Sequence, residues 1–144
     1  TYSGNMKKFL DDAAKKIGRD WKKLQPSIEV EWGNYEAAIE LASEIFGKNM
    51  FESRVKGKYQ GSKNRAVMDV ITYYFAVPKV REIARKKKIA IREAFERLSD
   101  QNADFQSSIQ VSTKTKTAVN NRFSLWGSEL SKILKIKLGV LKAK

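Results

Sequence analysis

Apolar residues recur at steps of three and four along most of the chain, a spacing that predicts amphipathic helices. The first helix is expected over about 6–17, where Gly18 ends it. The second is expected to start at Ile28, after Pro26, and to close at Gly47. Further helices are expected over 63–76, over 78–99, over a short stretch around 105–109, and from Thr113 or Thr115 to about 134.

The segment 63–76 is apolar almost all round, which is typical of a buried helix at the centre of a domain. Residues 70–75 also have strand propensity, but the sequence offers them no evident partner strand. Glycines between residues 47 and 62 predict an irregular loop. The expected fold is therefore all-α, with about five to seven helices around the central one. One domain is expected over 1–134, followed by a basic tail, 135–144, that frays.

Several conspicuous residues have a structural interpretation. Asn64 stands near the start of the central helix, where an amide serves as a cap, and a contact with nucleic acid is its alternative. Glu36, Glu40 and Glu44 follow one helix face, and a solvated surface is expected because one face cannot surround a metal ion. The core is expected to hold all three tryptophans: Trp21, Trp32 and Trp126.

Composition excludes several classes of function. The 144 residues suffice for about one domain, and they contain neither cysteine nor histidine. Thiol and zinc-thiolate chemistry, Ser-His-Asp catalysis and histidine-dependent nuclease chemistry are therefore impossible in this chain alone. We expect no catalytic residue, no metal and no cofactor, and hence no enzyme activity of its own. No apolar run is long enough to span a membrane, so no membrane partner is expected and the cytosol is the default location.

Positive charge is concentrated in the second two thirds of the chain. The net charge is +13, which divides into −1 over residues 1–47, +8 over 48–102 and +6 over 103–144. Such an asymmetry indicates a directional basic surface rather than general solubilisation.

The first candidate focus of that charge is a cationic stripe of Arg81, Arg85, Lys88 and Arg92. On one continuous helix these residues fall within about 60° of one another, opposite the apolar face. Guanidinium groups one turn apart can meet successive phosphates of a nucleic acid. The alternative is a solvated helix face, and a break at Lys86–Lys88 would split the stripe.

The second candidate focus is the loop before the central helix. Its cations alternate with glycines, which let a backbone approach a phosphate, and with Tyr59, which can stack on a base. The alternative is an ordinary basic surface loop. Arg122 either pairs with a buried carboxylate such as Asp69 or faces DNA. The loop candidates are Arg54, Lys56, Lys58, Lys63 and Arg65.

Short motifs spread along the chain carry a resemblance to a known family. Ile45-Phe46-Gly47 is followed by Phe51 and Arg54, then by Asn64-Arg65-Ala66-Val67, and later by Thr115 and the pair Arg122-Phe123. This order resembles the helical region of the GmrSD-type restriction proteins, called domain of unknown function 262. The chain departs from the family pattern at Met68, where phenylalanine is usual, and in the two residues between Phe51 and Arg54.

The resemblance implies a part of a phage-defence protein. Such proteins join a ParB-like nucleotide-hydrolysing module to a helical region, often followed by an HNH nuclease. The acid-Gly-Gln-Gln-Arg signature of the first module does not occur here, and the nuclease needs histidine. The implied role is therefore engagement of nucleic acid, expected to be double-stranded DNA, or coupling between the other modules of the parent protein without direct nucleic-acid contact.

Overall fold

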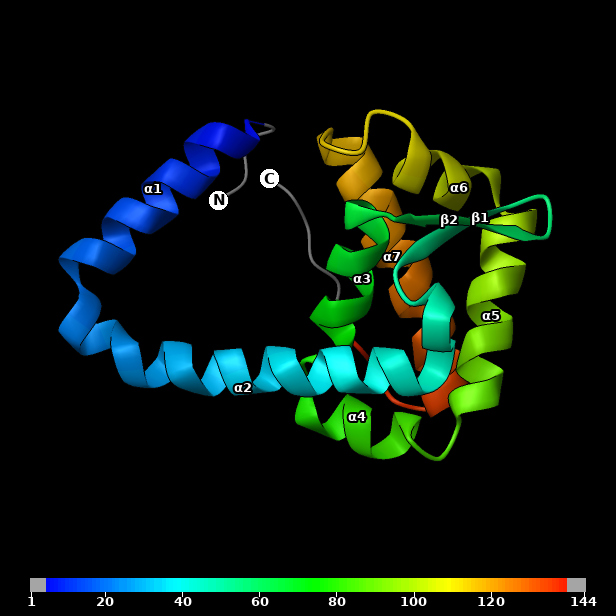
Figure 1. The fold of residues 1–144 in the computed structure, drawn as a ribbon, viewed down its shortest axis with the longest axis horizontal. Helices are drawn as coiled ribbons and strands as arrows, with labels where there is room; N and C mark the ends of the chain where they lie inside the picture. Colours follow the sequence, from blue (N-terminus) through cyan, green and yellow to red (C-terminus); the bar gives the residue numbers. More distant parts are fainter. Residues whose placement is uncertain (1–4, 140–144) are drawn as a thin grey trace.

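The structure, a computed structural model, describes residues 5–139. Within that range the chain forms seven α-helices, a short 3-10 helix and a two-stranded sheet, which confirms the expected all-α class (Figure 1). The elements follow one another as α1 (Met6–Arg19), α2 (Trp21–Phe46), η1 (Gly47–Asn49), β1 (Glu52–Val55), β2 (Lys58–Lys63), α3 (Arg65–Phe75), α4 (Pro78–Ala84), α5 (Lys88–Gln101), α6 (Ala103–Gln110) and α7 (Lys116–Leu134).

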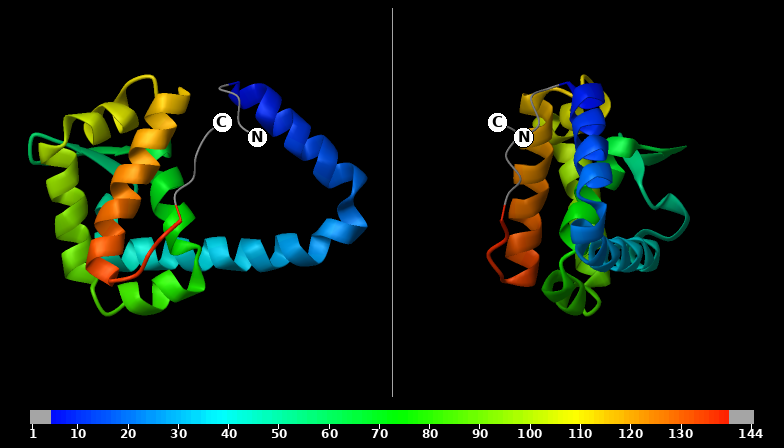
Figure 2. Two further views of the ribbon diagram at one scale, coloured as in Figure 1. Left: turned by 180° about the vertical axis from the view of Figure 1, so that it is seen from behind. Right: turned by 90° about the vertical axis from the view of Figure 1, so that its left-hand side faces the viewer.

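α1 and the first half of α2 project from the rest of the molecule (Figures 1 and 2). We call residues 6–33 the arm and residues 34–139 the body. No side chain that the structure describes in the arm is buried, whereas the second half of α2 is buried at Ala38, Leu41 and Ile45. α2 is therefore a single helix that begins in solvent and ends in the core.

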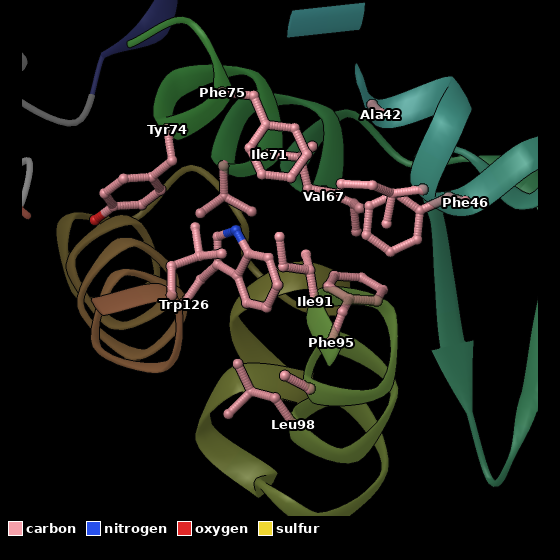
Figure 3. Packing of buried hydrophobic residues seen from close by; sticks show 14 of the residues in the cluster. Ala42, Phe46, Val67, Ile71, Tyr74, Phe75, Ile91, Phe95, Leu98 and Trp126 are labelled. Carbon is pink, nitrogen blue, oxygen red and sulfur yellow. The ribbon is translucent and has the colours of Figure 1, made fainter. Parts of the chain in front are cut away.

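α3 is the central helix, as the sequence predicts. It packs against α2, α4, α6 and α7 and against strand β1, and most of its residues are buried. Trp126 of α7 lies beneath it, fully buried, with its ring edge-to-face against Phe95 at a centroid distance of 5.5 Å (Figure 3). Phe95 in turn meets Phe46 edge-to-face at 5.3 Å, which connects α5 to the end of α2.

Tyr74 of α3 lies over Gly127 of α7. A Cβ atom on residue 127 would stand 2.2 Å from the Tyr74 hydroxyl oxygen, so only glycine fits without a shift. The hydroxyl donates a hydrogen bond of 2.7 Å to the carbonyl of Phe123 on α7. Burial raises the pKa of Tyr74 to about 12, so the hydroxyl keeps the proton that it donates.

Side-chain oxygens begin four of the helices. Asn5, Asn64, Asn102 and Thr115 each accept a hydrogen bond from a backbone N–H three residues further on. The cap of α3 is thus Asn64 itself, which confirms its structural interpretation, and its amide nitrogen also donates to the carbonyl of Ile109 at 2.8 Å. Such caps satisfy N–H groups that have no partner inside the helix.

The expected start of the second helix is wrong, because α2 begins at Trp21 and runs through Pro26. Proline lacks the N–H that would bond the carbonyl of Lys22. Both residues are exposed in the arm, where water can satisfy that carbonyl. The expected core positions of Trp21 and Trp32 are also wrong, since these side chains are 46% and 60% exposed.

The expected helix over 78–99 is divided into α4 and α5. The chain leaves α4 through backbone hydrogen bonds of the tighter i to i+3 kind, from Lys86 to Ile83 and from Lys87 to Ala84. On either side of this turn, Ala84 at the end of α4 and Ile91 in the first turn of α5 are buried against the core.

The segment expected as an irregular loop instead contains the antiparallel hairpin β1–β2. Val55 pairs with Lys58 across a two-residue turn in which Lys56 and Gly57 both have positive φ, 47° and 77°. Two successive residues of positive φ match the right-handed twist of paired strands, which is why such turns close hairpins. The sequence signal is weak because lysine occupies the first of these positions.

The chain beyond α7 continues along the body. Ile136 and Leu138 are half-buried and pack against the core, so residues 135–139 of the expected tail are placed, while 140–144 lie outside the described residues. No helix in the described range is both long and apolar enough to cross a membrane.

We expect Gly127→Ala to lower the free energy of unfolding by about 1–3 kcal/mol, because the added methyl group overpacks the contact with Tyr74. Gly33→Ala in α2 is the matched control, since its Cβ would meet nothing within 4 Å. There the gain in helix propensity should raise stability by roughly 0.5–1 kcal/mol. Urea unfolding of the two variants measures both effects, and an equal gain in both would contradict the packing argument.

Candidate nucleic-acid interface

The ten cations that the sequence nominates divide into two groups in the structure. Cations of the first group bond backbone carbonyls or the carboxylate of Asp100, whereas those of the second group are exposed. Two of the second group, Arg85 and Lys88, make exposed ion pairs with Glu44. The first group comprises Arg54, Lys63, Arg81, Arg92 and Arg122, and the second comprises Lys56, Lys58, Arg65, Arg85 and Lys88.

The expected stripe on one helix is wrong, because the break between α4 and α5 splits it. Arg81 turns inward and donates to the carbonyls of Phe75 and Ala76 at 2.9 and 2.6 Å, where α3 ends, and to the side chain of Asn34 at 2.9 Å. Burial, and then the charge of nearby Arg85, lowers the pKa of Arg81. Its guanidinium therefore serves the end of a helix rather than a ligand.

Arg92 has a comparable role at the end of α2. Its Nε donates to the carbonyl of Ile45 at 2.5 Å, one of the last carbonyls of that helix. Lys87, in the turn before α5, donates in the same way to the carbonyl of Ile133 at the end of α7. Cations placed at helix C-termini satisfy free carbonyls and oppose the negative end of the helix dipole.

Arg54 attaches the hairpin to α5. Its Nε lies 2.9 Å from a carboxylate oxygen of Asp100, and Glu96 lies 3.7 Å from another of its nitrogens. The hydrogen bond to Asp100 raises the pKa of Arg54, and the guanidinium lies over the ring of Tyr59 at 5.2 Å. Tyr59 itself donates to Glu96 at 3.0 Å, so this aromatic ring is engaged within the fold.

Lys63 closes the base of the same hairpin. Its ammonium donates to the carbonyls of Lys48 and Met50 at 3.0 and 2.8 Å and lies 3.5 Å from Glu52. Lys56 and Lys58, at the turn of the hairpin, remain exposed to solvent. Arg65, at the start of α3, is also exposed.

Arg122 is buried in the body. One guanidinium nitrogen donates to the carbonyl of Thr113 at 2.7 Å, with the carbonyl of Ser108 at 3.5 Å. Asp69 is near enough for the positive charge of Arg122 to act on its pKa, yet burial dominates and raises the pKa of that carboxyl. The orientation toward DNA is therefore wrong for Arg122, and it holds the segment before α7 against the body.

Several exposed cations lie together in the turn between α4 and α5. An open groove of about 710 Å³ is lined there by Arg85, Lys86, Lys87, Lys88, Ile89, Ala90, Glu93 and Ile133. We call it the cationic groove. Lys86 makes no side-chain hydrogen bond or ion pair within the described residues, and Glu44 of α2 faces Arg85 and Lys88 at 3.8 and 3.2 Å. From the sequence, Lys86 and Lys87 are expected only to broaden the helix stripe, whereas the structure places Lys86 in this groove.

The start of α5 adds partial positive charge to the cationic groove. Its cap residue, Lys87, makes no side-chain cap hydrogen bond, so the first N–H groups of the helix lack the partner that Asn64 supplies to α3. Unsatisfied N–H groups at a helix N-terminus favour anions such as phosphate. The groove thus combines mobile cations, backbone donors and an apolar floor at Ile89 and Ile133.

The two exposed basic regions lie at opposite ends of α5. The hairpin is bound to Asp100 near its C-terminus, and the cationic groove surrounds its N-terminus (Figure 1). Fourteen residues of helix span about 20 Å, so the two regions are separate.

The acidic residues form no metal site in the described part of the chain. Comparisons of the chain with protein-family models, with curated proteins and with solved structures found no match.

Replacing Arg81 or Arg92 by alanine should reduce stability, because each change removes hydrogen bonds from a charged donor to helix-terminal carbonyls. We expect a loss of about 1–3 kcal/mol for Arg81, and less for Arg92, which is more exposed. Lys86→Ala is the control, and its thermal unfolding midpoint should match that of the wild type. Midpoints that fall equally in all three variants would contradict the division of the cations into two groups.

Proposed function

We propose that the chain is a non-catalytic helical domain that binds the phosphate backbone of nucleic acid through the cationic groove. The observation that carries the proposal is the cluster of Arg85, Lys86 and Lys88 around the uncapped start of α5. None of these three side chains bonds a helix-terminal carbonyl, whereas Arg81 and Arg92 do. The net charge of +13 would then both bind nucleic acid and attract it over a distance.

The groove suits backbone contact better than base reading. Its polar groups are flexible cations and backbone donors, with Glu93 as the one acidic lining residue, and Tyr59 is held by Glu96. Contacts to phosphate position a protein, whereas sequence is read by rigid groups directed at base edges. The ion pairs with Glu44 are exposed, so exchanging them for phosphate contacts costs little.

The resemblance to the helical region of GmrSD-type restriction proteins supports the same proposal. In a phage-defence protein, a domain of this kind would bind double-stranded DNA. It would either bring the DNA to the catalytic modules of that protein or signal its presence to them. Coupling between such modules without nucleic-acid contact is the alternative, and the exposed apolar residues of the arm favour a protein contact there.

The test measures binding to a short DNA duplex at several salt concentrations. The groove variant carries Arg85→Gln, Lys86→Gln and Lys88→Gln. If each of the three cations meets a phosphate, the slope of log affinity against log salt should become shallower by about 2.7, which is three times about 0.9.

A second triple variant controls for net charge alone. Lys23→Gln, Lys79→Gln and Lys116→Gln remove the same charge from three exposed positions on α2, α4 and α7. We expect its salt slope to stay near that of the wild type. Equal slopes in both triple variants, or wild-type binding that does not weaken as salt rises, would overturn the proposal.

A further inference from the structure

The arm exposes more large apolar side chains than any other part of the described chain. On α1, Leu10 and Ile17 are 47% and 38% exposed, and helical spacing places them on one face. On α2, Trp32 is 60% exposed and lines an open, largely apolar groove with Ile28 and Tyr35. Neighbouring apolar faces of this kind mark an interaction surface rather than a solvated one.

The two helices of the arm carry opposite charges. Residues 5–23 have a net charge of +4, from seven Lys or Arg and three Asp residues. Residues 24–36, which contain Ile28, Trp32 and Tyr35, have a net charge of −3, since they contain three Glu and neither Lys nor Arg. α1 is thus a basic helix, whereas the part of α2 that carries the exposed apolar face is acidic, so the two complement each other.

These two faces cannot cover each other within one chain. α1 and α2 are joined through Asp20 alone, whose carbonyl already accepts hydrogen bonds from Lys23 and Leu24 in the first turn of α2. Two helices that fold back antiparallel need a connection of about 2–5 residues. The two helices accordingly diverge from their junction (Figures 1 and 2), so within the described residues neither face covers the other.

We propose that the arm pairs with the arm of a second copy of this chain. α1 of each protomer lies against the Ile28–Trp32–Tyr35 face of α2 in the other, so that basic flanks meet acidic flanks twice. A two-fold axis relates the two contacts, and the assembly closes as a dimer. An anionic lipid surface would attract α1 and repel the acidic half of α2, so one arm could not use both faces on it.

The first test measures molar mass by sedimentation or light scattering. The wild type should form a dimer that dissociates on dilution, and Trp32→Glu should be a monomer at concentrations where the wild type is dimeric. Val30→Glu is the matched control, because Val30 is 64% exposed and lies on the opposite face of α2. A wild-type monomer at every concentration, or equal loss of the dimer in both variants, would overturn the proposal.

The second test exchanges the charges. One protein carries Lys7→Glu, Lys15→Glu and Lys16→Glu, which change the net charge of residues 5–23 from +4 to −2, so that both helices of its arm are acidic. The other carries Glu31→Lys and Glu36→Lys, which change the net charge of residues 24–36 from −3 to +1. Each alone should dimerise more weakly than the wild type, because like charges oppose each other. Mixed together they should form a heterodimer, in which both contacts are complementary again.

Circular dichroism checks that all variants keep their helices, and failure of the mixture to dimerise would contradict pairing between arms. The inference does not depend on nucleic-acid binding, since every substituted residue lies outside the cationic groove.

Discussion

The contact between Tyr74 and Gly127 joins the central helix α3 to α7, and it leaves no room for a side chain at residue 127. With no side chain at residue 127, the Tyr74 hydroxyl reaches the carbonyl of Phe123 and the two helix backbones come close. Trp126, the next residue, is thereby placed under α3 and against Phe95 of α5. Because α2, α4 and α6 also pack on α3, a side chain at residue 127 would disturb the helix on which they pack.

A small body made of short helices has many helix ends, and their last carbonyls need donors. In this protein long cationic side chains supply several of them: Arg81 at the end of α3, Arg92 at the end of α2 and Lys87 at the end of α7. Part of the large positive charge therefore serves folding. A count of basic residues therefore overstates the basic surface that is available to a polyanion. That surface is concentrated at the start of α5, where Arg85, Lys86 and Lys88 lie together.

The elements that depend on interactions between residues close in sequence could be predicted. Those that depend on tertiary contacts or on solvent exposure could not. The periodic helices, the central position of α3 and the cap at Asn64 follow from residues within a few positions of one another. The path of α2 through Pro26 depends instead on solvent around the arm, and the hairpin depends on Asp100 and Glu96, more than 35 residues away.

The candidate site shows the same division. The sequence shows Lys86 and Lys88 as part of a basic run. It does not show which arginines bond the fold and which remain exposed, because that depends on which helix ends lie nearby. A helical wheel places Arg81 and Arg92 beside Arg85, while in the folded body their guanidinium groups reach the ends of two different helices. The exposure of Trp32 was equally hidden, since its periodic neighbours are those of a core helix.

α2 connects the two surfaces to which we assign functions. Its first half carries the apolar face of the arm, and its last turn carries Glu44, which pairs with Arg85 and Lys88 of the cationic groove. Twenty-six helical residues form a rod of about 39 Å. If two arms pair, two such rods hold two grooves at a fixed separation, and a duplex long enough to reach both would bind with the gain in affinity that multivalency provides. A break of α2 at Pro26 would leave the arm and the body free to reorient, so the fixed spacing of the two grooves depends on the helix remaining continuous through this exposed proline.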